Sequence, residues 1–385
     1  MSYFMKSQPW HFVFLLPTRF PTDKAYGVTT EFTALALQNL DFKVTISTSL
    51  YDQSLNTKLS VSATTNHLAE KLLSRKIRVA LTARFNLFVG VFAIHNALKF
   101  KGKNIVFWTR DIFLAFLVMK FTRNFIVCEI HRTPGKLQST CLRFLLKEKR
   151  VVITPISNFL PSIQKSSKFN TVFSPMSVNS GEIEFFKSFK NKKRKTIIYV
   201  GNESSGDYVL NVNLLNEVAL SLSETHPEWN IEIIGISESF FHSQIERHIS
   251  PNIELLGQIP RELVIKRLAT ASIGLVIYPN SKWLNDSSPI KIIEYAAAGA
   301  AIVASKSVAH LRLLDDQKCV FFEIDSAESL TGAIERLILD SSLRSLISHN
   351  ANNWSKIFTY ENRVQNILTE LDHRLNNKIV GPISI

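Results

Sequence analysis

Short apolar runs alternate with helix-like segments along this chain, and this alternation restricts the fold more than any other feature. In the first half, residues 11–16, 43–48 and 125–130 have the length and composition of buried parallel strands. The segments between the runs are long enough for crossover helices. The pattern therefore predicts an α/β protein built on doubly wound parallel sheets.

The alternation restarts after a lysine-rich stretch, residues 187–195, which is almost devoid of apolar side chains. We interpret this stretch as a solvated linker between two domains. Beyond it, three predicted strands end in glycine, at Gly201, Gly235 and Gly257. Glycine lets the backbone approach a ligand closely, and ligands of open α/β sheets bind beyond the carboxyl ends of the strands.

Charge is divided unevenly between the two halves. Of the net +13, residues 1–195 contribute +20 and residues 196–385 contribute −7. A basic first half favours a phosphorylated ligand, an anionic membrane surface or a polyanion. Nucleic acid is disfavoured, because the sequence has no zinc-finger spacing, helix-turn-helix pattern or RNP-like aromatic stripe.

The remaining composition excludes several classes of protein. Cys128, Cys141 and Cys319 form no metal-ligand spacing, and we expect them to be reduced and buried. No apolar run reaches the roughly 18 residues of a membrane span, and the first ten residues lack the order of a signal peptide. We expect a cytoplasmic protein.

Residues 286–305 carry the most specific pattern, Asp-Ser-Ser-Pro-Ile-Lys-Ile-Ile-Glu-Tyr-Ala-Ala-Ala-Gly-Ala-Ala-Ile-Val-Ala-Ser. Ser288 is a suitable N-cap, Pro289 suits the first helical position, and Gly299 suits the helix end. The exposed amides and the dipole of such a helix favour phosphate. Glu294, further along the helix, can accept hydroxyl hydrogen bonds from a ribose, or it can be an ordinary solvated acid.

This segment resembles the signature of family-4-type (group 1) retaining glycosyltransferases of the GT-B fold. Weaker matches are Lys24-Ala-Tyr-Gly27, Trp108-Thr-Arg-Asp111, Glu129-Ile-His131 and Tyr360-Glu-Asn-Arg363. The resemblance implies two Rossmann-like domains facing a central cleft, an acceptor-side domain over residues 1–186 and a nucleotide-sugar-binding domain over residues 187–364. It also implies a C-terminal helix, residues 365–385, that crosses back onto the first domain.

The resemblance implies roles for individual residues. Glu294 holds the ribose hydroxyls, Asp286 contacts hydroxyls of the donor sugar, and the amides around residues 288–290 bind phosphate. The implied catalytic residues are His131, Asp286 and Lys291. The implied donor-binding residues are Gly27, Gly201, Gly235, Arg261, Ser287, Ser288, Ile290 and Glu294, and Arg110 is placed on the acceptor side.

One departure from the family pattern concerns the leaving group. After the strand over residues 196–200 the family often has Gly-Arg and then Lys-Gly, whereas this chain has Gly201-Asn-Glu-Ser-Ser-Gly-Asp-Tyr208. The negative charge of a departing diphosphate must therefore be balanced by Arg19, Lys24, Lys291, helix amides or a metal.

The function that we expect is retaining transfer of a sugar from a nucleoside diphosphate sugar to a hydroxyl acceptor. The acceptor is expected to be a lipid-linked or cell-surface polysaccharide precursor. No cofactor is expected beyond the donor, and no metal, because the chain lacks an Asp-x-Asp motif. The alternatives are a catalytically weak nucleotide-binding relative and another GT-B enzyme such as a nucleotide-sugar epimerase.

Basic residues of the first half suit a lipid-linked phosphate or the anionic inner face of the plasma membrane, where the protein would be peripheral. The alternative is an ordinary soluble basic surface. The residues concerned are Arg75, Lys76, Arg78, Lys101, Lys103, Lys147, Lys149 and Arg150.

Overall fold

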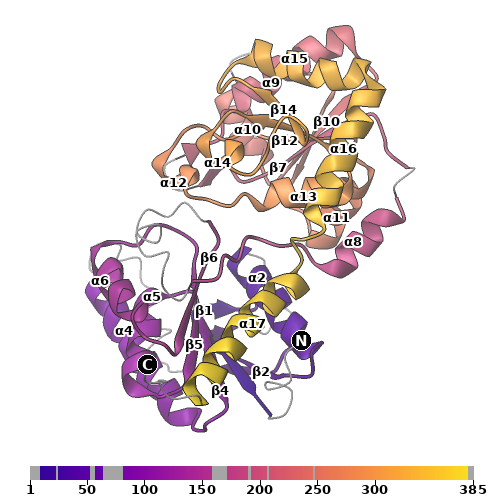
Figure 1. Ribbon diagram of the computed structural model, residues 1–385. Helices are drawn as coiled ribbons and strands as arrows, with labels where there is room; N and C mark the ends of the chain where they lie inside the picture. The colour runs from indigo at the N-terminus through magenta and orange to yellow at the C-terminus, as the bar shows by residue number, and fades with distance from the viewer. Residues whose placement is uncertain are drawn as a thin grey trace. The chain divides into compact units, whose positions relative to one another are not determined.

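The computed structural model describes residues 9–22, 25–52, 57–63, 81–157, 171–189, 192–205, 208–245 and 248–379. The chain divides into two compact units (Figure 1). Unit 1 comprises Met1–Pro175 and Tyr360–Ile385, and unit 2 comprises Met176–Thr359. The boundaries predicted from the sequence lie later, at 186/187 and 364/365.

Unit 1 is built on a six-stranded sheet whose paired strands are all parallel. Its strand order, β3-β2-β1-β4-β5-β6, is that of a doubly wound Rossmann-type sheet. The strands are β1 (His11–Phe20), β2 (Lys43–Tyr51), β3 (Val61–Ala63), β4 (Ile105–Thr109), β5 (Phe125–Ile130) and β6 (Val151–Pro155).

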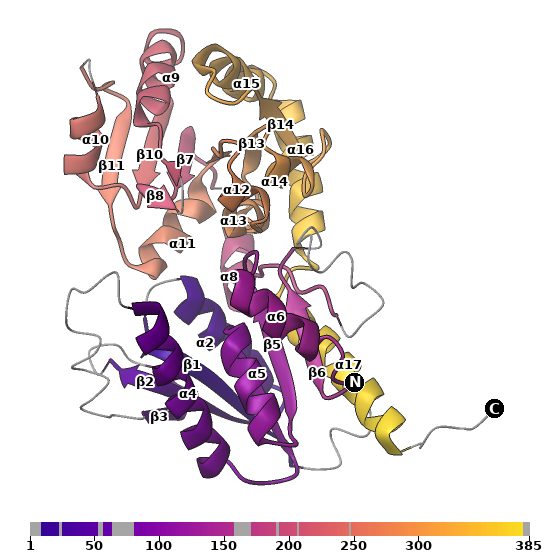
Figure 2. The same ribbon diagram turned by 90° about the vertical axis from the view of Figure 1, so that its left-hand side faces the viewer.

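Helices cover both faces of this sheet because alternate strand residues point to opposite sides. On one face, α2 (Ala25–Gln38) and α17 (Tyr360–Ile379) pack on Phe12, Phe14 and Trp108. On the other face, α4 (Leu81–Lys99), α5 (Ile112–Phe121) and α6 (Lys136–Leu145) pack on Val13, Leu15 and their neighbours. Figure 2 shows these three helices in front of the sheet.

Unit 2 repeats the same topology. Its six-stranded parallel sheet has the order β11-β10-β7-β12-β13-β14. The strands are β7 (Thr196–Val200), β10 (Asn230–Ile234), β11 (Ile253–Gly257), β12 (Ile273–Val276), β13 (Ala301–Ser305) and β14 (Cys319–Phe322), beside a small hairpin of β8 (Ser204–Ser205) and β9 (Tyr208–Val209). The helices are α8 (Ser180–Lys187), α9 (Val212–Thr225), α10 (Glu238–Gln244), α11 (Arg261–Thr270), α12 (Lys282–Asn285), α13 (Ile290–Ala298), α14 (Val308–Leu311), α15 (Ala327–Leu339) and α16 (Ser341–Ser355).

The predicted α/β class and the two doubly wound sheets are confirmed, and two local predictions are wrong. Pro17 does not end the first strand, because a register shift between Leu16 and Arg19 accommodates its missing N–H, and β1 continues to Phe20. The lysine-rich stretch lies within unit 2: Lys193 donates to the carbonyl oxygen of Ala298 at the end of α13.

The C-terminal helix α17 packs on α2 within unit 1. The prediction of buried, unpaired cysteines is borne out. All three cysteines are free and buried. Among the helices that the structure describes, none is long and apolar enough to cross a bilayer.

Candidate active site

The start of α13 is the centre of the predicted donor site. The helix begins at Ile290, and its N-cap is Pro289 with an extended ψ of 105°. The prediction that Ser288 caps the helix is therefore wrong by one residue, and no side chain caps the first turn. The helix ends as predicted at Gly299, which adopts a left-handed φ of 71°. The first amides of α13 thus remain available to a ligand.

Two serines immediately before this turn have buried hydroxyl groups without a partner. The Oγ atoms of Ser287 and Ser288 are shielded from solvent and neither donate nor accept a hydrogen bond. A buried hydroxyl without a partner costs on the order of 1–3 kcal/mol. Native structures keep such groups where a ligand or water completes them. Asp286, one residue earlier, is the C-cap residue of α12 and is partly buried.

Glu294 lies one turn further along α13 with its side chain only 1% exposed. One carboxylate oxygen is 2.5 Å from the guanidinium of Arg261, and the other is 2.7 Å from Nζ of Lys291. Burial alone raises the pKa of this carboxyl, but Lys291 and Arg261 more than compensate and lower it to about 2. Glu294 is therefore an ionised carboxylate inside the protein.

Arg261 is held from its other side by an acid that the sequence analysis did not identify. Nε and Nη2 of Arg261 donate to the two oxygens of Glu182 in α8, at 3.1 and 2.9 Å. Burial raises the pKa of Glu182, and Arg261 opposes that rise. The result is a chain of alternating charges, Glu182, Arg261, Glu294 and Lys291, that fixes the inner face of α13. No sequence signal marks Glu182, which lies 79 residues from its partner.

Gly201 and Gly235 end two neighbouring strands, β7 and β10, and they touch each other. The amide of Gly201 donates to the carbonyl oxygen of Ile234 at 3.0 Å. Gly235 has a φ of 90°, and a Cβ at this position would overlap the carbonyl oxygen of Gly201. Gly235 is thus required for close backbone packing, and a Cβ at Gly201 would overlap the side chain of Tyr199. Their predicted contact with the donor stays a prediction.

The segment after β7 holds an acid where the family often has cations. The carboxylate of Glu203 accepts hydrogen bonds from the amide of Ser237 at 3.0 Å and from its hydroxyl at 2.5 Å. These hydrogen bonds hold the pKa of Glu203 below its usual range. The backbone amide of Ser237, at the start of α10, therefore already has the Glu203 carboxylate as its hydrogen-bond acceptor.

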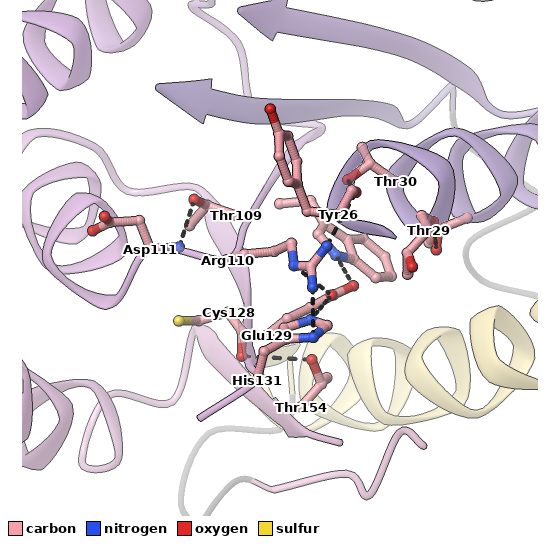
Figure 3. A network of polar contacts seen from close by, with 12 residues as sticks. Tyr26, Thr29, Thr30, Thr109, Arg110, Asp111, Cys128, Glu129, His131 and Thr154 are labelled. Carbon is pink, nitrogen blue, oxygen red and sulfur yellow. Dashed lines mark hydrogen bonds and ion pairs between the residues drawn. The ribbon is translucent and has the colours of Figure 1, made fainter. Parts of the chain in front are cut away.

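Unit 1 contains a second buried polar cluster, centred on Glu129 at the end of β5 (Figure 3). Glu129 accepts a hydrogen bond from Nε1 of Trp108 at 2.7 Å and forms an ion pair of 2.8 Å with Arg363 of α17. Burial would raise the pKa of Glu129, but Arg363, His131 and Arg110 hold it well below its usual range.

His131 lies between Glu129 and Arg110. Its Nε2 is 2.6 Å from Glu129, and its Nδ1 is 2.5 Å from Nη2 of Arg110. A guanidinium can only donate, so Nδ1 accepts and Nε2 carries the proton. Burial and the charge of Arg110 lower the pKa of His131 to about 3. The imidazole is therefore neutral, and both of its nitrogens are engaged within the protein.

Arg110 connects this cluster to the first turn of α2. Its Nη1 donates to the carbonyl oxygen of Tyr26 at 3.0 Å, as Figure 3 shows. Gly27, the next residue, is buried, and a Cβ there would overlap Thr22. Lys24 lies outside the described residues, and Arg19 is exposed and ion-paired with Asp52 at 3.2 Å. Within the described part of the chain, no group of three or more His, Cys, Asp or Glu is placed to hold a metal ion.

Comparison with known protein families finds a match within unit 2. Residues 180–354 match the family described as glycosyl transferases group 1. Comparison with curated proteins finds no match.

Solved glycosyltransferase structures share the architecture of the whole chain. A glycosyltransferase from Rickettsia africae has a TM-score of 0.66 at 14% identity, with 96% of this chain and 99% of that chain covered. HepE of Anabaena, in complex with UDP and glucose, has a TM-score of 0.65 at 12% identity, with 94% of this chain and 99% of that chain covered. WaaG, a glycosyltransferase of lipopolysaccharide biosynthesis, has a TM-score of 0.63 at 12% identity, with 93% of this chain and 99% of that chain covered. Residues 180–354 are therefore similar to the group 1 glycosyl transferases, and the chain as a whole has the GT-B fold.

Proposed function

We propose that this protein is a retaining glycosyltransferase that moves a sugar from a nucleoside diphosphate sugar to a hydroxyl group of an acceptor. The observation that carries the proposal is the start of α13, where uncapped amides adjoin the orphaned hydroxyls of Ser287 and Ser288. A phosphate would supply the missing partners to all of these groups. HepE, a protein of the same fold, is described in complex with UDP and glucose.

Each group at α13 has a role in this proposal. The diphosphate accepts hydrogen bonds from the hydroxyl of Ser288 and from the amide of Ile290. Glu294 is ionised at neutral pH and its oxygens retain lone pairs, so it accepts hydrogen bonds from the ribose hydroxyls. Asp286 contacts hydroxyls of the donor sugar, and Lys291 contributes positive charge beside the phosphates.

The reaction needs charge stabilisation more than a nucleophilic side chain. The bond between the anomeric carbon and the diphosphate oxygen breaks, and the acceptor oxygen forms its bond on the same face of the sugar. The acceptor proton leaves with the diphosphate. Because negative charge develops on the departing oxygen, helix amides and cations that already face it lower the barrier. Closure that excludes water strengthens each of these interactions.

Unit 1 is proposed to contribute His131 and Arg110 and to bind the acceptor. His131 acts as a neutral imidazole whose orientation Glu129 fixes, so it supplies no positive charge. The basic character of the first half favours a lipid-linked phosphate acceptor, with the protein peripheral on an anionic membrane surface. Of the basic residues named above, Arg75, Lys76 and Arg78 lie outside the described residues, and Arg150 pairs with Glu148 at 3.2 Å.

A catalytically weak nucleotide-binding protein is the second candidate. The observation that favours it is the segment after β7, which offers Glu203 in place of a cation. Lys291 and Arg261 are also partly neutralised by Glu294 and Glu182. This candidate predicts the same nucleotide binding as the first, but no turnover.

Binding of nucleoside diphosphates tests both candidates. Thermal unfolding of the purified protein is measured with uridine, guanosine, adenosine or cytidine diphosphate. A nucleotide present at about 100 times its Kd stabilises the folded protein by about 2.7 kcal/mol. For a unit of this size we expect one nucleotide to raise the Tm by about 5–10 °C. Glu294→Gln removes the carboxylate charge while keeping the side-chain shape, and it should abolish the shift.

Glu232→Gln is the matched control. Glu232 is a buried acid on β10 of the same unit, and it is also paired with two arginines, Arg194 and Arg267. Its variant should lose stability yet keep the nucleotide shift. If all four nucleotides leave the Tm of the wild type unchanged, the donor site at α13 is wrong.

Turnover then separates the two candidates. With the donor of the selected nucleotide, release of nucleoside diphosphate that depends on an added acceptor supports the transferase. Binding without release supports the weak relative. Activity that survives chelation of divalent cations supports the proposed independence from metal, and activity restored only by a metal contradicts it.

A further inference from the structure

Three neighbouring surface helices of unit 1 contain no acidic residue. The sequences of α4, α5 and α6 hold lysines and arginines but not one aspartate or glutamate. The helices lie side by side over one face of the sheet, in the order α4, α5, α6 (Figure 2). By contrast, surface helices of unit 2 such as α15 contain glutamate residues. The absence of acids leaves this layer with positive charge only.

The outward side chains of this layer are largely apolar. On α4, Val91, Ile94 and Leu98 recur at helix spacing on the exposed side, and Leu98 is 61% exposed. Each lies on the side opposite the core residues Val89 and Phe92. Monomeric proteins rarely gather such residues on adjacent elements without an interaction site.

The other two helices continue the same surface. Phe121 ends α5 with 53% exposure, and Leu137 and Phe144, seven residues apart on α6, are 50% and 51% exposed. Phe116, partly buried on α5, packs against Phe144 with ring centroids 5.7 Å apart. The apolar groups therefore extend across all three helices.

Cations are placed among these apolar groups. Nζ of Lys120 lies 5.6 Å from the ring centroid of Phe116 and 5.9 Å from that of Phe144. Lys136 and Arg143 are exposed on α6, one residue before Leu137 and Phe144 respectively. Aromatic and aliphatic groups interleaved with lysines are typical of surfaces that lie in the headgroup region of a bilayer.

We propose that the α4–α5–α6 face docks on the surface of an anionic lipid bilayer. The apolar side chains enter the boundary of headgroups and acyl chains, and the cations meet the lipid phosphates. A second copy of the chain is a poor occupant, because a two-fold contact would bring two cationic surfaces without acids against each other. Nucleic acid would leave the apolar side chains without a partner. The proposal does not depend on transferase activity.

Co-sedimentation with vesicles tests the proposal. The protein is mixed with vesicles of phosphatidylcholine alone or with about 30 mol% phosphatidylglycerol, a composition chosen to supply anionic headgroups. We expect binding to the anionic vesicles that weakens with salt. The triple variant Leu98→Ser, Phe121→Ser, Phe144→Ser should partition at least about tenfold less. The double variant Lys120→Glu, Arg143→Glu should lose about fivefold or more per charge.

Matched controls come from unit 2, where Leu339 at the end of α15 is 75% exposed and Ile357 in the turn after α16 is 63% exposed. The double variant Leu339→Ser, Ile357→Ser should bind vesicles like the wild type. The variant Phe144→Trp reports insertion directly, because the emission of its new indole should shift to the blue on binding and be quenched by brominated lipid.

Three outcomes would overturn the proposal. The first is that the protein does not bind anionic vesicles. The second is that the triple variant binds as well as the wild type while its Tm is unchanged. The third is that the Phe144→Trp variant binds vesicles but its fluorescence emission does not change. Self-association in sedimentation velocity that the triple variant abolishes would assign the surface to a second copy instead.

Discussion

Acidification should destabilise unit 1 through His131, and the size of the effect follows from the geometry of its cluster. The perturbation is a fall in pH from about 8 to about 5, across the ordinary pKa of a histidine, compared between the wild type and His131→Gln. Glutamine offers one donor and one acceptor in a similar place but does not titrate.

The sign follows from where the proton binds. The unfolded chain protonates His131 near its ordinary pKa of 6.5, whereas burial and Arg110 lower the folded-state pKa to about 3. A group with a depressed folded pKa contributes full stability above the unfolded value and loses it as the pH falls. Between these two pKa values the loss is about 1.4 kcal/mol per pH unit, so at about pH 5 it reaches about 2 kcal/mol.

Urea unfolding measured at both pH values provides the assay. Other titrating groups act equally in both proteins, so only the difference between them is used. The stability advantage of the wild type over His131→Gln should shrink by about 2 kcal/mol between about pH 8 and about pH 5. An NMR titration should also show no protonation of this imidazole above about pH 5. A difference that is the same at both pH values, or an imidazole that titrates near its ordinary pKa, would refute the buried His131–Arg110 contact.

Three further predictions concern packing, a buried ion pair and the leaving group. Gly235→Ala forces a Cβ onto a backbone with a φ of 90° and should lower the free energy of unfolding by at least about 2 kcal/mol. The control Gly332→Ala, at an open position of α15, should raise the free energy of unfolding by about 0.5–1 kcal/mol. Equal urea midpoints for the two variants would contradict this prediction. Arg363→Met leaves Glu129 without its strongest cation and should cost about 3–5 kcal/mol in urea unfolding; a loss below about 1 kcal/mol would show that the pair is not buried as described. Asn202→Arg restores a cation to the segment after β7, where the family often has one. Calorimetry should show about tenfold tighter nucleotide binding by this variant, with binding by Asn202→Gln unchanged; a weaker complex would place the diphosphate elsewhere.

Local chemistry allowed the sequence to predict much of the fold. Apolar runs of strand length, each followed by a helical segment, have few stable arrangements other than a doubly wound sheet. The end of α13 was predictable because a helix that stops at Gly299 uses the one residue that adopts φ 71° without strain. Its start was predicted one residue early, because the extended ψ of Pro289 is not visible in the sequence.

The partners of the site residues were not predictable, because they come from distant parts of the chain. Glu182 and Arg261 are brought together only when α8 and α11 pack beside α13. In the same way, Arg363 reaches Glu129 only because α17 packs on α2 and β6 within unit 1. The resemblance drew attention to Arg363, but no local pattern indicates which buried acid it meets.

The most direct test of the donor site is a crystal structure of the protein with the nucleoside diphosphate that it binds. The account predicts that the diphosphate lies at the start of α13. Its oxygens should be within hydrogen-bond distance of the Ser288 hydroxyl and the Ile290 amide, and the ribose hydroxyls should contact Glu294. A diphosphate bound away from α13, with Ser287 and Ser288 still unpartnered, would contradict the assignment.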